Sequence, residues 1–464
     1  MDNNKIFILL PDGIGLRNFA YSSFNDIGKK LGYNVIFWNN TPFPLSDLGF
    51  KEIKIEDAKP NPLTDIYKNI KIQAELNLNI KKNKDKVYNT YRFPFSYSTL
   101  KTAIKSIVIQ VLTGYYDTEK GLQKIRKKMN HYERKTIFYK QSLETLQKEK
   151  PSLVFCTNQR PVIAIAPLLA AQDLGIPTAT FIFSWDNLPK ATMVVETDYY
   201  FVWSTHMREE LLFYYPNIKA EVIFITGTPQ FEVHFDKKIL LSREVFCKQY
   251  KLDLNRKYIC FSGDDVTTSP DDPLYLEDTA KAIYKLNDKN FNLGIIFRRC
   301  PTDFSSRYDK ILEKYSDVIV AIDPLWKAFS TNWNTILPSK ADGYLLCNIA
   351  NYCELVVNLG SSTVFDFVAH EKPCGYFRYN QKLQINKNWD VFKCYRFVHF
   401  RSMPNAEVVV WLNNPEEIAL KIEKMLKDSK TTVDHAKNWF KVINQHPPQD
   451  ASERIWGSIK TIIS

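Results

Sequence analysis

The sequence predicts an α/β protein built from two domains, each with a parallel sheet, and three observations lead to this fold class. Short apolar runs rich in Val, Ile and Phe alternate with helical windows along most of the chain, a pattern typical of parallel sheets with helices on both faces. This series stops at a polar, charged stretch, residues 231–255, and then starts again. At 464 residues the chain is also too long for one hydrophobic core and long enough for two.

The first series of elements forms the expected N-terminal domain, residues 1–235. A basic, helical segment of about residues 62–150 is inserted in it, and further helices are expected over 16–31, 164–174 and 207–215. The predicted strands are residues 5–10, 34–38, 152–156, 178–183, 199–203 and 221–226.

The second series forms the expected C-terminal domain, residues 236–430, with helices over 275–286 and 341–350. The tail, residues 431–464, is predicted to be helical with a break at 446–448, and to pack back on the N-terminal domain. No short internal repeat is present, so the two halves share an architecture rather than a sequence. The predicted strands are residues 257–262, 292–297, 317–322, 354–359 and 374–377.

The composition argues against several kinds of protein and against a bound metal. Eight cysteines and seven histidines are scattered without a CxxC pair or the Cys/His spacing of a zinc site. We therefore expect reduced core cysteines, a cytoplasmic location, and neither a metal nor another cofactor. The net charge of +11 attracts anions, but nucleic acid is not an expected partner because no binding motif for it is present. The sequence contains no uncharged apolar run of about 18 residues, so a membrane-spanning helix is not expected.

The basic segment Lys101–Lys150 contains about a dozen Lys and Arg against five acidic residues. It opens with KTAIKSIVIQVLTGYY, an apolar stretch with lysines near one end. One interpretation is a solvated face on a packed helix. The other is peripheral docking to the anionic inner face of a membrane, where lipid-linked acceptors are found.

The strongest local signal for a ligand site lies in the segment 354–377, ELVVNLGSSTVFDFVAHEKPCGYF. A buried strand is expected to end at Leu359, Gly360 turns the chain, and residues 361–363 (Ser-Ser-Thr) begin a helix. Backbone N–H groups and hydroxyls at a helix start bind anions, so a nucleoside diphosphate fits here without a metal. The alternative is that Ser361 or Ser362 only caps the helix.

Several motifs, in sequence order, carry a resemblance to a known family. The strand, glycine and Ser-Ser-Thr of 354–363 resemble the donor-binding loop of GT-B glycosyltransferases, and Ser184-Trp185-Asp186-Asn187 resembles a motif of bacterial surface and capsular polysaccharide transferases. Gly227-Thr228-Pro229-Gln230-Phe231-Glu232 resembles the segment that closes the N-terminal domain of such enzymes. Ser361-Ser362 with Phe365-Asp366 is similar, more distantly, to a loop of teichoic-acid glycerophosphate polymerases.

This resemblance implies two Rossmann-like domains (the GT-B architecture) facing across a cleft, with C-terminal helices. It also implies metal-independent transfer of a sugar from a nucleotide-sugar donor to a glycan or lipid-linked glycan acceptor, in surface polysaccharide biosynthesis. Arg298-Arg299-Cys300-Pro301 departs from the pattern, because Cys300 stands where glycerophosphate polymerases have a histidine. Three alternatives remain: a transferase of glycerophosphate or an acidic sugar from a CDP or CMP donor, a UDP-sugar 2-epimerase, and a binding protein without activity.

Loops after predicted strands supply the candidate residues for the donor, because ligands of open α/β sheets bind at the carboxyl ends of strands. Arg298 could neutralise the donor phosphates, and Ser262-Gly263 could contact them or form a plain turn. Asp366 could reach a ribose hydroxyl or could only cap its helix. The predicted donor-binding residues are Ser262, Gly263, Arg298, Gly360, Ser361, Ser362, Thr363 and Asp366.

Two carboxylates are candidates for the base that deprotonates an acceptor hydroxyl. Asp12 follows the first strand, where inverting enzymes of the resembling family often keep a base, and Asp186 follows the strand 178–183. Either could instead only order its loop. The predicted acceptor-binding residues are Arg17, Asn18, Trp185 and Asn187.

Overall fold

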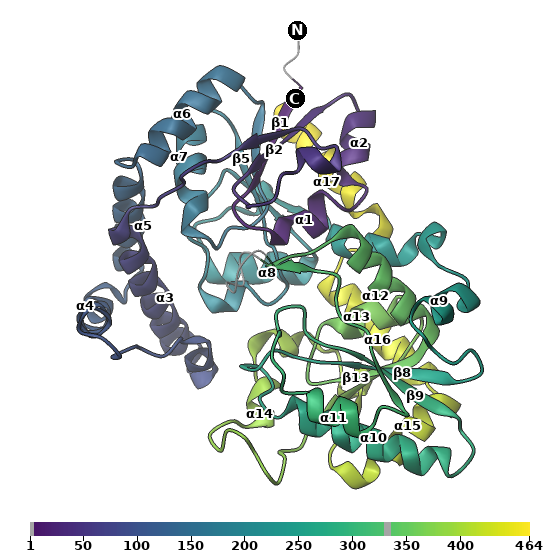
Figure 1. The fold of residues 1–464 in the computed structure, drawn as a ribbon. Coiled ribbons are helices and arrows are strands. Elements are labelled where there is room, and N and C mark those ends of the chain that lie inside the picture. The colour runs from purple at the N-terminus through teal and green to yellow at the C-terminus, as the bar shows by residue number, and fades with distance from the viewer. Residues whose placement is uncertain (1–3, 329–335) are drawn as a thin grey trace. The chain divides into compact units, whose positions relative to one another are not determined.

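The computed structural model describes residues 4–328 and 336–464 and divides the chain into two compact units. Unit 1 is Met1–Pro229 together with Ile443–Ser464, and unit 2 is Gln230–Val442. Each unit contains a parallel sheet with helices against it (Figure 1). The predicted α/β class with two parallel sheets is confirmed.

Unit 1 is built on a seven-stranded parallel sheet in the order β3-β2-β1-β4-β5-β6-β7. The apolar runs of the sequence form its strands because both faces of a parallel sheet are covered and exclude water; β1 and β4 are buried over almost their whole length. Strand β3 was not predicted, since three partly buried residues give no periodic signal. The strands are β1 (Lys5–Leu10), β2 (Asn34–Asn39), β3 (Glu52–Lys54), β4 (Leu153–Cys156), β5 (Thr178–Phe181), β6 (Tyr199–Val202) and β7 (Ile223–Ile225).

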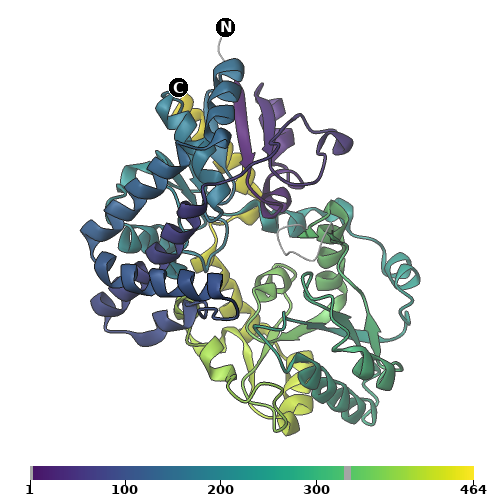
Figure 2. The same ribbon diagram turned by 60° about the vertical axis from the view of Figure 1, so that its left-hand side comes forward.

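The inserted segment of unit 1 folds into four helices, α3 to α6, which gather beside the sheet (blue in Figure 2). Side-chain caps define where these helices begin: Asn61, Thr99, Thr118 and Thr136 each accept a hydrogen bond from a backbone N–H of the first turn. The helices of unit 1 are α1 (Ile14–Phe19), α2 (Phe24–Lys30), α3 (Pro62–Asn83), α4 (Leu100–Tyr116), α5 (Glu119–Glu133), α6 (Ile137–Glu149), α7 (Ile165–Asp173), α8 (Thr205–Tyr214) and α17 (Ala451–Ile463). Among the described helices, none has the length and hydropathy needed to cross a bilayer.

The single helix predicted over 16–31 is wrong, because the chain forms two short helices, α1 and α2, there. The Ser22 hydroxyl donates to the carbonyl of Asn18 (2.5 Å) and accepts from the N–H of Phe24 (3.2 Å). Such local side-chain bonds compete with the helical ladder and favour a break.

Unit 2 contains a six-stranded parallel sheet in the order β10-β9-β8-β13-β14-β15. Its buried core joins the strands to helices α10 and α15. Strand β15, which has three residues, was not predicted. The strands are β8 (Lys257–Ser262), β9 (Leu293–Arg298), β10 (Ile319–Ala321), β13 (Cys353–Asn358), β14 (Cys374–Phe377) and β15 (Val410–Leu412), with β11 (Lys327–Ala328) and β12 (Ile336–Leu337) in a small antiparallel pair.

The helices of unit 2 follow the strands as the sequence predicts, including the two expected over 275–286 and 341–350. They are α9 (Arg243–Gln249), α10 (Asp272–Asn287), α11 (Asp309–Lys314), α12 (Lys340–Tyr352), α13 (Thr363–Val368), α14 (Val391–Cys394), α15 (Ile418–Lys427) and α16 (Lys430–Ile443), the last ending where the chain returns to unit 1.

In both sheets the strand order reverses once. In unit 1 the chain runs outward from β1 through β2 to β3 and then restarts on the other side with β4; in unit 2 the same reversal lies between β8 and β13. Loops that follow the two strands at such a switch point diverge and leave a crevice where ligands bind in open α/β sheets. The two switch points are therefore the first places to look for a site.

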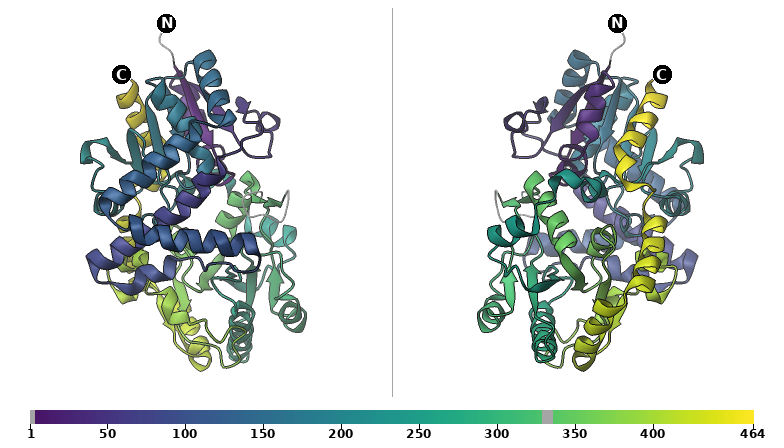
Figure 3. Two further views of the ribbon diagram at one scale, coloured as in Figure 1. Left: turned by 90° about the vertical axis from the view of Figure 1, so that its left-hand side faces the viewer. Right: turned by 90° about the vertical axis from the view of Figure 1, so that its right-hand side faces the viewer.

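The C-terminal helix α17 belongs to unit 1 and packs on α2 near the start of the chain (yellow beside purple in Figure 3). The Trp456 ring stacks between Phe24 (centroids 4.7 Å apart) and Tyr33 (4.9 Å), and its indole N–H donates to the carbonyl of Phe24 (2.7 Å). A Cβ added at Gly28 would lie 2.2 Å from the Trp456 ring. Only glycine at this position lets the indole approach so closely.

Replacing Gly28 by alanine should therefore destabilise unit 1 by about 1–3 kcal/mol through overpacking, and lower its thermal unfolding midpoint by several degrees. Gly457→Ala is the matched control, because a Cβ at this position in α17 meets nothing within 4 Å. Alanine there should stabilise the helix by up to about 1 kcal/mol. Equal effects of the two substitutions would contradict the packing of α17 on α2.

Candidate active site

At the switch point of unit 1, the loops after β1 and β4 bring Asp12 and Asn158 together. The Asn158 amide Nδ2 donates to Asp12 Oδ2 (2.7 Å), and the N–H of Ile14 donates to Asp12 Oδ1 (3.2 Å). The N–H of Arg160 donates to Asn158 Oδ1 (3.1 Å), which fixes the amide so that its N–H side faces the carboxylate. Asn158 was not predicted as a site residue, because nothing in the sequence shows that β1 and β4 are neighbours.

Burial raises the pKa of Asp12 to about 6, against the two hydrogen bonds and the positive charge of Arg160, which lower it. A carboxylate with a pKa close to the working pH suits general base catalysis. Gly15 has no room for a side chain, because a Cβ there would lie 2.4 Å from Thr157 Oγ1. The glycine therefore lets α1 pack against the loop after β4.

The rival base, Asp186, lies in the loop after β5. It accepts hydrogen bonds from Ser184 Oγ (2.7 Å) and Asn187 Nδ2 (3.1 Å) and forms an ion pair with Lys190. In α8, burial and the negative charge of Asp186 raise the pKa of Glu210 to about 8. One carboxylate paired with a lysine and another held protonated near neutral pH make a second acid–base candidate, and Glu210 was not predicted.

The predicted acceptor residues have different environments. Arg17 is exposed on α1, and Trp185 is partly buried. Asn18 and Asn187 are both 2% exposed, and Asn18 Nδ2 makes a long hydrogen bond of 3.5 Å to Thr228 Oγ1. The two asparagines therefore line the interior of unit 1 rather than its surface.

At the switch point of unit 2, the loops after β8 and β13 bring three hydroxyls together. Ser262 Oγ lies 3.2 Å from Thr363 Oγ1, and Ser361 Oγ lies 2.8 Å from the same oxygen. Gly360 has a φ of +70°, a left-handed conformation that lets the chain turn sharply from β13. The predicted donor loop and the end of β8 thus meet in space. The two hydrogen bonds use two of the three hydroxyl protons, and the third hydroxyl can donate to an anion.

Ser362 occupies the N-cap position of α13, but its side chain makes no capping hydrogen bond and is exposed. Ser361 does local structural work instead, because its Oγ accepts from the N–H of Thr363 (3.3 Å). The alternative that these serines only cap the helix thus applies to Ser361 and not to Ser362. Gly263, at the end of β8, lies close to Tyr308: an added Cβ would be 3.0 Å from its hydroxyl.

Arg298 ends β9 and is 6% exposed. Its Nη2 donates to both carboxylate oxygens of Asp342 (2.9 Å each), so one side of the guanidinium is already occupied. Within residues 4–328 and 336–464, Nη1 is buried without a hydrogen-bond partner. A buried donor left unpaired is costly, and a phosphate oxygen is a fitting acceptor for it.

An acidic pair, Asp264 and Asp272, lies beside the end of β8 and was not predicted as part of the site. Tyr308 donates to Asp272 Oδ2 (2.7 Å), and the N–H of Asp264 approaches the same oxygen (3.2 Å). Burial raises the pKa of Asp272 to about 6, and burial with the charge of Asp272 raises the pKa of Asp264 well above its usual range. A proton held by this pair near neutral pH limits its repulsion of a bound diphosphate.

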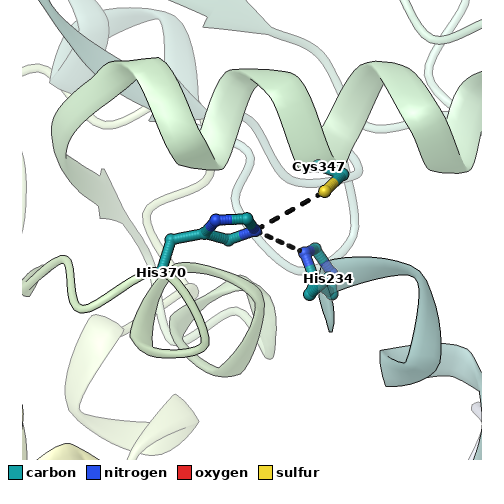
Figure 4. Close-up of side chains that lie close together, drawn as sticks. All are labelled: His234, Cys347 and His370. Atoms are coloured by element: carbon teal, nitrogen blue, oxygen red, sulfur yellow. Dashed lines mark hydrogen bonds between the residues drawn. The ribbon is translucent and has the colours of Figure 1, made fainter. Parts of the chain in front are cut away.

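The other predicted donor residue, Asp366, bonds away from the switch point. Its Oδ1 accepts from His234 Nε2 (2.9 Å). His234, Cys347 and His370 place one ligand atom each within 4.8 Å of one another (Figure 4). No metal-type spacing was visible in the sequence, because these residues are far apart along the chain.

A cavity of about 310 Å³ lies elsewhere in unit 1, lined by Arg126, Glu196, Thr197 and Asp198 among others. Thr197 and Asp198 directly precede β6, so this cavity is at the amino ends of the strands. Ligands of open α/β sheets bind at the carboxyl ends, and we therefore place one candidate ligand site at the switch point of each unit.

The two doubly wound sheets, each with polar residues at its switch point, define the fold as GT-B, as the sequence resemblance implied. No protein-family model and no curated protein sequence matches the chain. Solved structures that share the fold include S. aureus MnaA in a co-structure with UDP (TM-score 0.54, 13% identity, 99% of this chain and 96% of that one). A putative UDP-N-acetylglucosamine 2-epimerase from Listeria monocytogenes (0.54, 11%, 99% and 96%) and a glycosyltransferase from Rickettsia africae (0.53, 12%, 99% and 98%) are similar too. At this identity the similarity establishes the fold alone.

Asp12→Asn should change the pH dependence of stability. The pKa of Asp12 is raised on folding, so the wild type loses stability as pH rises from about 4 to about 6, where the native carboxyl must ionise in a buried place. The neutral asparagine has no such cost, so the stability of the variant relative to the wild type should rise by up to about 3 kcal/mol over this interval. The lost acceptor lowers the stability of the variant by about 1 kcal/mol at every pH. Thermal unfolding of both proteins from pH 4 to pH 7 measures the difference. A difference that stays constant with pH would contradict the burial of the charge.

Proposed function

We propose that the protein is a glycosyltransferase that moves a sugar from a nucleotide-sugar donor to a hydroxyl of a glycan or lipid-linked glycan, in surface polysaccharide synthesis on the cytoplasmic side of a membrane. The observation that carries the proposal is the content of the two switch points. One holds a buried carboxyl whose pKa is near 6, and the other holds a group of hydroxyls with an unpaired arginine N–H nearby.

Unit 2 would bind the donor. The hydroxyls of Ser262, Ser362 and Thr363 and the Nη1 group of Arg298 are hydrogen-bond donors suited to phosphate oxygens. Because they are fixed by the fold, they would stabilise the charge that develops on the leaving nucleoside diphosphate without reorganisation. We propose that these groups bind the diphosphate without a metal.

Unit 1 would bind the acceptor. The acceptor oxygen forms a bond to the anomeric carbon while the bond from that carbon to the diphosphate oxygen breaks, and the hydroxyl proton passes to the base. We assign the base to Asp12, with Asp186 as the alternative, and assign Arg17 and Trp185 to the binding of the acceptor. The predicted acceptor residues Asn18 and Asn187 are buried, and we assign them to the support of these loops instead. A single base acting on the acceptor implies inversion at the anomeric carbon.

A second candidate is a UDP-sugar 2-epimerase, which acts on the donor alone. It is favoured by the similarity to a putative epimerase from Listeria monocytogenes over nearly the whole length of both chains. The two activities differ in their substrates: an epimerase consumes or interconverts a UDP-sugar without an acceptor, whereas a transferase releases the nucleotide only when an acceptor hydroxyl, or slowly water, receives the sugar.

The donor class can be identified by thermal unfolding of the protein with UDP, GDP, CDP, CMP or dTDP, without added metal. A ligand that binds only the folded state raises the midpoint, by about 2.7 kcal/mol of stabilisation at a hundredfold excess over its Kd. We expect one nucleoside diphosphate to raise the midpoint, and Ser362→Ala to weaken its binding by about 10–150-fold, the equivalent of about 1.5–3 kcal/mol for a hydrogen bond to a charged group.

Ser316→Ala is the matched control. Ser316 is an exposed serine of unit 2 that precedes β10, so it lies at the amino ends of the strands rather than at the carboxyl ends. It should leave the response to the nucleotide unchanged. If none of the nucleotides raises the midpoint, the donor assignment fails. A response to a cytidine nucleotide alone would favour the glycerophosphate or acidic-sugar alternative.

Helix α4 supports peripheral contact with an anionic membrane. An exposed apolar stripe, which we call the α4 face, runs along this helix at spacings of three and four residues. Lys101 is exposed on the same helix and would complement anionic lipid headgroups, whereas Lys105 is paired with Asp65 (2.6 Å). The α4 face consists of Leu100 (80% exposed), Ile104 (53%), Ile107 (53%), Val111 (68%) and Tyr115 (71%).

Val111→Glu should reduce binding to phosphatidylserine-containing vesicles by about tenfold or more, because it replaces an apolar side chain that would enter the lipid by a charge. Co-sedimentation with vesicles measures this. Leu420→Glu, at an equally exposed leucine in α15 (65%), is the control and should bind as the wild type does. Absence of vesicle binding, or self-association lost with Val111→Glu, would assign the face to protein contacts instead.

A further inference from the structure

Three metal-ligating side chains from distant parts of the sequence converge in unit 2 (Figure 4). His234 comes from the 3-10 helix Pro229–Phe235, Cys347 from α12, and His370 from the turn after α13. His234 Nδ1 lies 3.0 Å from His370 Nε2, and Cys347 Sγ lies 3.6 Å from the same nitrogen. The two imidazole rings are nearly perpendicular, with an interplanar angle of 80°, so their nitrogens point to one place without stacking.

Two of the three edges of this triangle are close to those of a tetrahedral metal site. Zinc bonds of about 2.0–2.1 Å to imidazole nitrogen and about 2.3 Å to thiolate sulfur give N···N edges of about 3.3 Å and N···S edges of about 3.6 Å. The distance from Cys347 Sγ to His370 Nε2 already has this value, and the two nitrogens need to separate by a few tenths of an ångström. The third edge, from Cys347 Sγ to His234 Nδ1, lies within 4.8 Å, and a bound ion would draw these two atoms to about 3.6 Å. Two imidazoles with one thiolate are ligands that zinc accepts readily.

A carboxylate orients one of the histidines. Asp366 Oδ1 accepts from His234 Nε2 at 2.9 Å, which places the ring proton on Nε2 and directs the lone pair of Nδ1 to the centre of the cluster. Carboxylate–histidine pairs of this kind accompany most histidine ligands of zinc and raise their basicity. The His234 side chain is 1% exposed and Cys347 is fully buried, whereas His370 is partly exposed and leaves a way in for an ion.

We infer that His234, Cys347 and His370 form a zinc site, with Asp366 as the residue that positions His234. On binding, Cys347 releases its thiol proton, and the proton on the liganding Nε2 of His370 moves to Nδ1. The fourth position is left for water. The site would tie the first segment of unit 2 to α12 and to the end of α13, and so hold in place the helix that carries Thr363. This revises the expectation of a metal-free protein and does not depend on the proposed catalytic function.

The test is the zinc content of the tag-free, full-length protein, reconstituted with zinc and dialysed against a weak chelator. We expect about one zinc per chain in the wild type, near zero in Cys347→Ala, and an affinity lower by about 10–100-fold in Asp366→Asn. Cys353→Ala is the matched control, since Cys353 is an equally buried free cysteine one residue after α12. It should keep its zinc.

Cobalt provides a readout that does not depend on how well the variants fold. The cobalt-substituted wild type should show a thiolate-to-cobalt charge-transfer band and the visible bands of a tetrahedral site, and zinc should displace them. A wild type without stoichiometric zinc, a cobalt spectrum without the thiolate band, or zinc retained by Cys347→Ala would overturn the inference and leave a hydrogen-bonded cluster of neutral side chains.

Discussion

The reversal of strand order in each parallel sheet is the constraint on which the rest of the structure depends. Because β1 pairs with both β2 and β4, and β8 with both β9 and β13, the loops after the central strands leave the sheet in opposite directions. Polar side chains can stand in the crevice between them without disturbing the core. Asp12 and Asn158 use one such place, and the hydroxyls around Thr363 use the other.

The two switch points differ in their electrostatics, because different charged groups are buried at each of them. In unit 1 a single carboxyl is taken out of water with only an amide, a backbone N–H and a nearby arginine charge to offset the cost, so it binds a proton more tightly than usual. In unit 2 the basic group Arg298 is half satisfied by Asp342, and the acids nearby hold a proton. The switch point of unit 1 is suited to accepting a proton, and that of unit 2 is suited to binding negative charge.

Helix α13 links the two sets of contacts in unit 2. Thr363 at its start belongs to the hydroxyl group at the switch point, whereas Asp366 in its middle and His370 just after it belong to the cluster with His234 and Cys347. With six residues, the helix is too short to be stable by itself. Its position therefore depends on tertiary contacts: its apolar face is buried, with Phe365 packed against Trp439 and Phe440, and its polar residues belong to the two sets of contacts.

The sequence by itself determined the α/β class, almost all of the longer strands and the loops in which the candidate residues lie, because a buried strand and the turn after it are encoded by consecutive residues. It also indicated the loop 360–363 and Asp12 as candidate site residues. It missed β3, β15, the two-residue strands β11 and β12, and the break between α1 and α2. Only the tertiary structure decided which loops meet. It places Asn158 against Asp12, pairs Asp342 with one side of the Arg298 guanidinium, and brings residues 234, 347 and 370 together. Such contacts depend on strand order and helix packing, and these are set by the whole core rather than by any local stretch of sequence.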